Sequence, residues 1–227
     1  MHMKGTTIAA ATAHSPRRML STRNAGWAKA LARNVGRAGV RPNLVSIASV
    51  GFAAVACGAF WSAPDTTPGV RMALLLLAAA SIQCRLLCNL LDGMLAVEEG
   101  FKSKTGDIYN DLPDRVADVL ILVGAGAAVR HLLYGATLGW LAALLAVFTA
   151  YVRLLGGSLG ATQFFIGPMA KQHRMFTLSV ATLVSAVEAM LGLPPRAMRL
   201  GLGLIVAGSI VTVYRRTQGI IREVNAR

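Results

Sequence analysis

The sequence predicts an all-α integral membrane protein in which six transmembrane helices follow an N-terminal amphipathic surface helix. Hydrophobic residues occupy 55% of the 227 positions and charged residues only 15%, with a mean hydropathy of +0.55. A soluble domain of this length carries more charge at its surface. The charges that are present gather between long apolar stretches, as is typical of the ends of membrane helices. A single membrane domain over residues 42–227 is therefore expected.

The N-terminal region precedes the first apolar stretch. Residues 1–18 are rich in Thr, Ala, Ser and His without periodicity, which predicts a disordered tail. In residues 19–41, apolar positions such as Trp27 and Leu31 recur at helical spacing against lysines and arginines. This pattern is typical of an amphipathic interfacial helix. Pro42 ends it and starts the first span.

Six apolar stretches follow, and each is long enough to cross a bilayer at about 20 residues per crossing. The predicted spans are residues 43–63, 69–96, 107–133, 136–157, 174–193 and 197–221.

Basic residues orient these spans. Six crossings place both termini on one side, together with the loops at 97–106 and 158–174, and all of these segments are basic. The positive-inside rule makes that side cytoplasmic. We therefore expect a multi-pass protein of a bacterial-type inner membrane with cytoplasmic termini.

The net charge of +13 raises the question of nucleic acid. The cations sit at the ends of apolar runs and form no stripe with interleaved aromatic residues, so no nucleic-acid partner is predicted. Anionic headgroups of membrane lipids are the expected partners.

A polar segment between the second and third spans carries the chemistry. Charges at the mouths of membrane helices are costly unless they hold something. By position the segment reads Asn89-x2-Asp92-Gly93-x2-Ala96-Val97-x8-Gly106-x3-Asn110-x3-Asp114. It resembles the signature of the CDP-alcohol phosphotransferase family, D-x2-D-G-x2-A-R-x8-G-x3-D-x3-D, at five of its eight fixed positions.

The segment departs from that signature at three positions. Asn89 stands at the first Asp, Asn110 at the third Asp and Val97 at the Arg. Each Asn keeps a carbonyl oxygen and removes a negative charge, so cation affinity should fall more than geometry changes. Asp107, Asp111 and Asp118 lie nearby on faces of the same helix as Asp114 and could compensate, and Asp111 is the preferred substitute ligand.

The spacing predicts a divalent metal site. Asn89 and Asp92 end the second span, while Asn110 and Asp114 begin the third, and spacings of three and four keep each pair on one helix face. A short hairpin should bring all four side chains to one depth on facing helices. Such oxygen donors suit Mg²⁺ or Mn²⁺.

The resemblance implies a role for each position. Divalent cations would clamp a CDP pyrophosphate, Asp114 would deprotonate the acceptor alcohol, and Asp92 would be the second catalytic carboxylate. Arg85 could touch phosphate, orient Asp92 or only neutralise carboxylates, and Asn43 could contact nucleotide, although capping its helix is the favoured reading. The residues expected around the nucleotide are Asn43, Arg85, Gly93, Ala96 and Gly106.

Three cations near the cytoplasmic ends of the fourth and fifth spans could bind the phosphate of a phosphorylated acceptor: Arg153, Lys171 and Arg174. The alternative is that the positive-inside bias alone places them there.

The predicted function is that of a phospholipid-synthesis transferase of the membrane. It would move a phosphatidyl or other phospho-alcohol group from a CDP-linked donor, with CDP-diacylglycerol favoured, to the hydroxyl of a small polar alcohol, releasing CMP in a reaction that depends on a divalent metal. The resemblance also implies a homodimer. Two alternatives remain open: a catalytically impaired relative that serves as a lipid- or nucleotide-binding scaffold, and a transporter.

Overall fold

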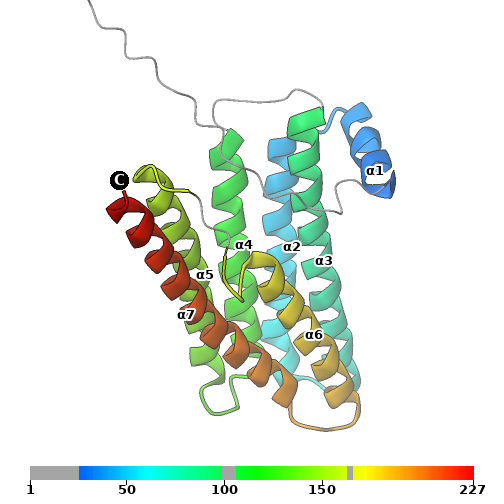
Figure 1. Cartoon of the computed structure of the whole chain (residues 1–227). Coiled ribbons are helices and arrows are strands. Elements are labelled where there is room, and N and C mark those ends of the chain that lie inside the picture. Colours follow the sequence, from blue (N-terminus) through cyan, green and yellow to red (C-terminus); the bar gives the residue numbers. More distant parts are fainter. Residues whose placement is uncertain (1–25, 99–105, 163–165) are drawn as a thin grey trace, which may run out of the picture.

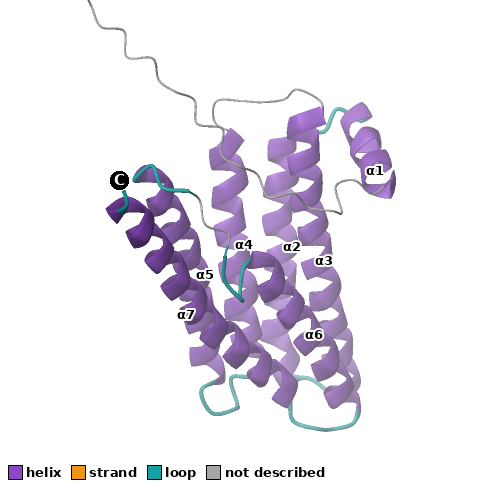
Figure 2. Ribbon diagram, viewed as in Figure 1, coloured by secondary structure: helices purple, strands orange, loops and turns teal. Residues whose placement is uncertain are grey.

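The computed structural model describes residues 26–98, 106–162 and 166–227, and the predicted tail at 1–18 lies outside them. Every regular element in these ranges is helical (Figure 2). The elements are α1 (Gly26–Arg37), α2 (Pro42–Ser62), the 3-10 turn η2 (Ala63–Asp65), α3 (Pro68–Glu98), α4 (Gly106–Ala128), α5 (Gly135–Ser158), α6 (Lys171–Met190) and α7 (Arg196–Asn225).

Helix α1 lies beside the bundle formed by the other helices (Figure 1). Its buried residues, Ala28 and Ala32, pack with Leu91 and Leu95 of α3, whereas Trp27 is exposed. The helix falls within the predicted range 19–41, of which residues 19–25 are not described. Its position on the membrane surface stays a prediction.

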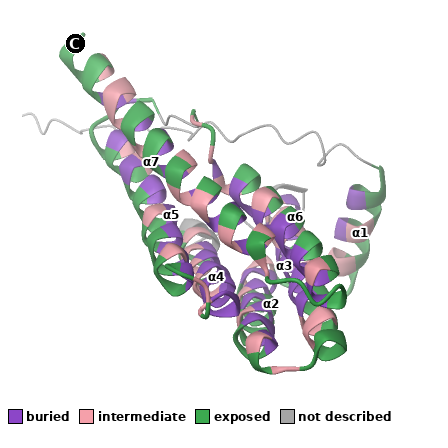
Figure 3. Ribbon diagram, turned by 90° about the horizontal axis from the view of Figure 1, so that it is seen from below, coloured by how far each residue is buried: buried purple, intermediate pink, exposed green. Residues whose placement is uncertain are grey.

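The six long helices, α2 to α7, run back and forth along the bundle (Figure 1). Helix α2 is central, because α3 and α4 both pack against it, and α6 and α5 then pack on α3 and α4. Figure 3, an end-on view, shows the buried residues turned toward the bundle interior. Alanines such as Ala53, Ala56 and Ala78 fill much of this core and let the helices approach closely.

Helices α4 and α5 approach each other closely through glycines. A Cβ placed on Gly139 would lie 2.6 Å from the Cα of Gly126, so no larger side chain fits there without moving a helix. Close approach through small residues is the usual way in which membrane helices pack.

Four helical segments of the described chain are long and apolar enough to cross a membrane: Pro42–Asp65, Pro68–Leu95, Gly135–Ser158 and Arg196–Asn225. The prediction of six spans is therefore not confirmed. Helices α4 and α6 have the length of a crossing but are more polar, since α4 carries Asp111, Asp114 and Asp118 within its first 13 residues. Their polar side chains turn inward to one another, as described below.

Helix α6 is shorter than its neighbours. It has 20 residues against 31 in α3, or about 30 Å against about 46 Å at 1.5 Å per residue. Both helices reach the same lower end of the bundle in Figure 1, so α6 begins well below the end at which α3 finishes. The first turn of α6 therefore lies alongside the polar half of α4.

Candidate active site

Three carboxylates of α4 lie on one side of that helix, at spacings of three and four residues. They are Asp111, Asp114 and Asp118, and each meets cations from neighbouring helices. The cluster occupies the half of the bundle nearer the end of α3. We describe it from the innermost carboxylate outward.

Asp118 is fully buried and binds two arginines. Its Oδ1 accepts a hydrogen bond of 2.6 Å from Arg85 of α3, and its Oδ2 accepts one of 2.9 Å from Arg174 of α6. Arg85 and Arg174 are 0% and 1% exposed. This ion-pair chain joins three helices through one carboxylate, and it explains why an arginine can stand in the apolar sequence of α3.

Asp114 lies one turn above Asp118 and is 9% exposed. Lys171, the first residue of α6, donates to its Oδ2, and Arg85 approaches its Oδ1 at 3.3 Å. Arg115 is 3.9 Å from Oδ2. Positive charge thus surrounds the carboxylate that the signature assigns as the base.

Asp111 is the outermost and most exposed of the three. Its Oδ1 accepts hydrogen bonds from Arg153 of α5 at 2.9 Å and from Arg115 at 3.2 Å. Two of the three cations predicted to hold acceptor phosphate, Arg153 and Lys171, are thus partly exposed and ion-paired, with 22% and 28% of their side-chain surface exposed. Arg174, the third, is buried beneath them.

Asp92 of α3 has a different environment. It is 5% exposed, and its Oδ2 accepts a hydrogen bond of 2.7 Å from the hydroxyl of Ser46 in α2. Its Oδ1 is buried without a hydrogen-bond partner in the described part of the chain. One turn earlier, the Nδ2 of Asn89 is also buried without a partner. Asp92 lies within electrostatic range of Asp114 and Lys171, so both signature carboxylates belong to one cluster.

The other signature positions are placed only in part. Gly93 follows Asp92 in α3 and is half-buried, Ala96 lies in the last turn of α3, and Gly106 begins α4. The side chains of Ala96 and Asn110 are not described, and of Gly106 only the helical backbone is.

The capping role expected for Asn43 is wrong. Asn43 is the second residue of α2, Pro42 is the first, and Arg41 is the N-cap, which makes no side-chain capping hydrogen bond. Pro42 needs no acceptor for its nitrogen, so one of the groups that a cap satisfies is already absent. Asn43 is half-buried in this first turn, and its contact with nucleotide stays a prediction.

The arrangement of α3 and α4 also differs from expectation. The two helices were expected to face each other, yet both pack mainly on α2, and the long side chain of Arg85 links them. Within the described ranges, no group of three or more His, Cys, Asp or Glu residues could hold a metal ion. The α4 carboxylates are occupied by cations, whereas Asp92 offers a free oxygen. The residues present therefore fit a divalent ion on the α3 side.

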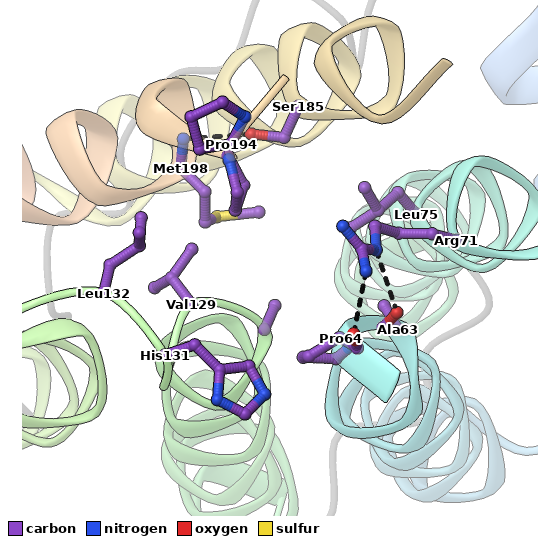
Figure 4. Close-up of a pocket in the computed structure, with 12 residues that line it drawn as sticks. Ala63, Pro64, Arg71, Leu75, Val129, His131, Leu132, Ser185, Pro194 and Met198 are labelled. Carbon is purple, nitrogen blue, oxygen red and sulfur yellow. Dashed lines mark hydrogen bonds between the residues drawn. The ribbon is translucent and has the colours of Figure 1, made fainter. Parts of the chain in front are cut away.

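A separate cavity of about 240 Å³ lies at the opposite end of the bundle, near the 3-10 turn and the start of α7 (Figure 4). Arg71 and His131 are among its lining residues, but the guanidinium of Arg71 donates to the carbonyl oxygens of Ala63 and Pro64. None of the predicted site residues lines this cavity, which separates it from the charged cluster.

Comparison with known proteins places this fold. The chain has a TM-score of 0.69 and 21% identity to a crystal structure of phosphatidylinositol phosphate synthase from Mycobacterium tuberculosis with CDP-DAG bound, over 86% of this chain and 94% of that one. The structure of the same synthase in complex with manganese and citrate gives a TM-score of 0.68 at 21% identity, over 86% and 88%. These structural neighbours are CDP-alcohol phosphotransferases. The fold that the sequence motif suggested is thereby confirmed.

Sequence comparisons add less. An uncharacterized protein of Aquifex aeolicus (strain VF5) is 26% identical over 185 residues, which cover 80% of this chain and 82% of that protein. No protein-family model matches the sequence.

The contacts of three residues in the cluster were not predicted from the sequence, although Asp118 was considered as a metal ligand. Ser46 binds Asp92, Arg115 lies beside Asp111 and Asp114, and Asp118 anchors both buried arginines. The spacing of Arg115 after Asp111 is a readable ion-pair signal. Ser46 is 46 positions away from Asp92, and no local spacing could reveal that contact.

Proposed function

We propose that this chain is a membrane CDP-alcohol phosphatidyltransferase that moves a phosphatidyl group from CDP-diacylglycerol, or a phospho-alcohol group from a related donor, to an acceptor hydroxyl. The observation that carries the proposal is the burial of both signature carboxylates, Asp92 and Asp114, in one charged cluster. The cluster stands in a fold shared with a synthase crystallised with CDP-DAG.

In the proposed reaction, the acceptor oxygen attacks the β-phosphorus of the donor, and the bond from that phosphorus to the bridging oxygen of CMP breaks. Asp114 takes the hydroxyl proton. Its Oδ1 is the more available oxygen, because Arg85 holds it only at 3.3 Å while Lys171 binds Oδ2. Arg85 and Lys171 hold this carboxylate in place between α3 and α6.

A divalent cation, Mg²⁺ or Mn²⁺, would be held by Asp92 and Asn89. Asn110, Asp111 and Asp114 were also expected as ligands from the sequence, but Asp111 and Asp114 are already paired with Arg153 and Lys171, so the proposal places the ion at Asp92 and Asn89. When bound it would neutralise the pyrophosphate and the departing CMP. The free Oδ1 of Asp92 supports this assignment. Asn43, Arg85, Gly93, Ala96 and Gly106 are proposed to surround the nucleotide end of the donor.

The acceptor is proposed to carry a phosphate. Arg153 and Lys171 are partly exposed at the outer part of the cluster, so an incoming phosphate can share them with Asp111 and Asp114. Arg174 is buried and held by Asp118, and we propose that it supports the site from beneath Arg153 and Lys171 without touching the acceptor. Glycerol phosphate and inositol phosphate are the acceptor classes that this charge favours.

The proposal includes the membrane arrangement. Helices α4 and α6 cross with the four apolar segments, giving six spans, and α1 lies on the surface of the same leaflet as the cluster. Both termini are cytoplasmic in a bacterial-type inner membrane, and two chains form a homodimer.

The test is a transferase assay on purified protein in nanodiscs. We expect CMP release from CDP-diacylglycerol with Mg²⁺ or Mn²⁺, faster with glycerol phosphate or inositol phosphate than with the free alcohols, and a product identified by mass. Chelation of the metal should stop it. Asp92→Asn and Asp114→Asn should each abolish turnover, whereas Asp65→Asn, at the opposite end of the bundle, should not.

A near-normal rate in either site variant would contradict the assignment. The competing function is a non-catalytic lipid- or nucleotide-binding scaffold, favoured by the ion pairing of all three α4 carboxylates. Binding of CDP-diacylglycerol without CMP release under any metal or acceptor would establish that function instead.

A further inference from the structure

The carboxylates of the cluster are unequally compensated. The three on α4 meet five cations of the protein itself: Arg85, Arg115, Arg153, Lys171 and Arg174. Asp92 on α3, in contrast, forms no ion pair within the described residues, and its hydrogen-bond donors there, the hydroxyl of Ser46 and the backbone N–H of Gly93, are neutral. The demand for an added cation is therefore confined to the α3 side.

That demand is strong, because a buried carboxylate oxygen without a partner is costly. Asn89 lies three positions before Asp92, on the same helix face. Its Nδ2 is buried and unpartnered, so turning the amide over loses no described hydrogen bond and presents the carbonyl oxygen. A carboxylate and an amide oxygen on one face are suitable ligands for a hard divalent ion.

The α4 side opposes a second ion. Lys171 binds Asp114 Oδ2, and Arg85 approaches Oδ1. A divalent ion bound by Asp114 would stand beside both cations, and like charges so close together repel strongly. Lys171 begins α6, whose shortness places its ammonium at the depth of Asp114.

We infer that the site binds a single divalent cation, through Asp92 and Asn89, and that Lys171 serves as a built-in cation that keeps metal away from Asp114. This inference rests on the proposed function, in which Asp114 is the base. Asp114 stays free of a metal bond and so remains able to accept the proton of the hydroxyl. Lys171 is a positioning residue in this scheme, since it acts through Asp114.

The experiment titrates the purified chain in detergent with Mn²⁺ alone, following free Mn²⁺ by electron paramagnetic resonance. We expect one tight site per chain in the wild type. Asp92→Asn should remove it, whereas Asp114→Asn should change its Kd less than about threefold. Two tight ions, no tight ion, or equal losses in the two variants would overturn the inference.

A second set of variants tests Lys171 directly. Asn110→Asp restores a carboxylate to α4 and should still give one tight ion, because Lys171 remains. Asn110→Asp combined with Lys171→Met should bind two, and Asn110→Asp combined with Lys29→Met, a change at an exposed lysine of α1, should bind one. A second tight ion in Asn110→Asp alone, or none in the Lys171 combination, would contradict the role of Lys171.

The titration needs no donor lipid, so it separates this inference from the proposed function. One ion at Asp92 in a chain that releases no CMP supports the inference and contradicts the function. Two ions bound by a chain that releases CMP would contradict the inference and support the function. Elution and helical content identical to wild type establish that each variant is folded before its titration is read.

Discussion

Replacing Asp118 by Asn should destabilise the protein strongly. Asp118 is fully buried and binds two arginines that are 0% and 1% exposed. Removing one partner of such a buried pair typically costs about 3–5 kcal/mol, because charge is left uncompensated. Here two guanidinium groups lose their carboxylate together. Arg85 keeps its 3.3 Å contact to the carboxylate of Asp114 and a 3.4 Å hydrogen bond to the carbonyl oxygen of that residue, and Arg174 keeps a 3.5 Å contact to Thr149.

The measurement is equilibrium unfolding in mixed micelles with increasing sodium dodecyl sulfate, followed by tryptophan fluorescence. Asp65→Asn is the matched control, since Asp65 pairs with Arg130 and His131 on the exposed end of the bundle and such pairs contribute at most about 1 kcal/mol. We expect the Asp118 variant to lose at least about 3 kcal/mol. A loss no larger than that of the control would refute the reasoning.

A neutral replacement of the whole chain of ion pairs extends this test. Well-packed apolar residues can substitute for a buried ionic group with little loss. Arg85→Met, Asp118→Leu and Arg174→Met together should therefore recover most of the stability that Asp118→Asn loses, while leaving no transferase activity. A triple variant less stable than Asp118→Asn would show that the three charges hold the helices together directly.

Two further predictions concern packing and metal affinity. Gly139→Ala should lower the free energy of unfolding by about 1–3 kcal/mol, because its Cβ would meet Gly126 at 2.6 Å. Gly203→Ala, whose Cβ would have nothing within 4 Å, should not destabilise the protein. Equal effects of the two changes in the same micelle assay would contradict the close contact of α4 and α5. Asn89→Asp should tighten Mn²⁺ binding by about tenfold or more, since a second carboxylate near the ion adds attraction. Asn34→Asp, on the exposed face of α1, should leave the Kd unchanged. An unchanged Kd in Asn89→Asp would remove Asn89 from the ligand set.

Local sequence spacing predicted much of this site, and contacts between helices escaped it. The pattern of Asp92 and Asp114 indicated the fold. Arg85 stands in an apolar run, where a charge facing lipid is costly, and the structure buries it inside the bundle. The partner of Arg85 could not be read, because α3 and α4 meet through α2 and through one long side chain. Spacing along a helix fixes which side chains share a face, but the rotation of each helix about its axis depends on packing from every neighbour.

The number of membrane crossings was likewise predictable from the sequence only in part. Hydropathy identified the apolar segments of α2, α3, α5 and α7, and these four meet the length and composition of a crossing. Helices α4 and α6 carry charges whose cost depends on whether partners lie inside the protein. A window of sequence contains no information on those partners, so their status as crossings stays with the proposal.

The shared carboxylate of Asp118 has a consequence for biogenesis. Alone in lipid, α4 would expose several ionised groups and α6 two cations, and each such group costs about 2.5–3.5 kcal/mol at the centre of a helix during insertion. Arg85 on α3 is translated before Asp118, and Arg174 after it. In the proposed arrangement of six spans, we therefore expect α3 to wait beside the translocon for α4, and α6 to join that pair afterwards, so that a nascent chain cut before α6 should remain open to extraction and degradation.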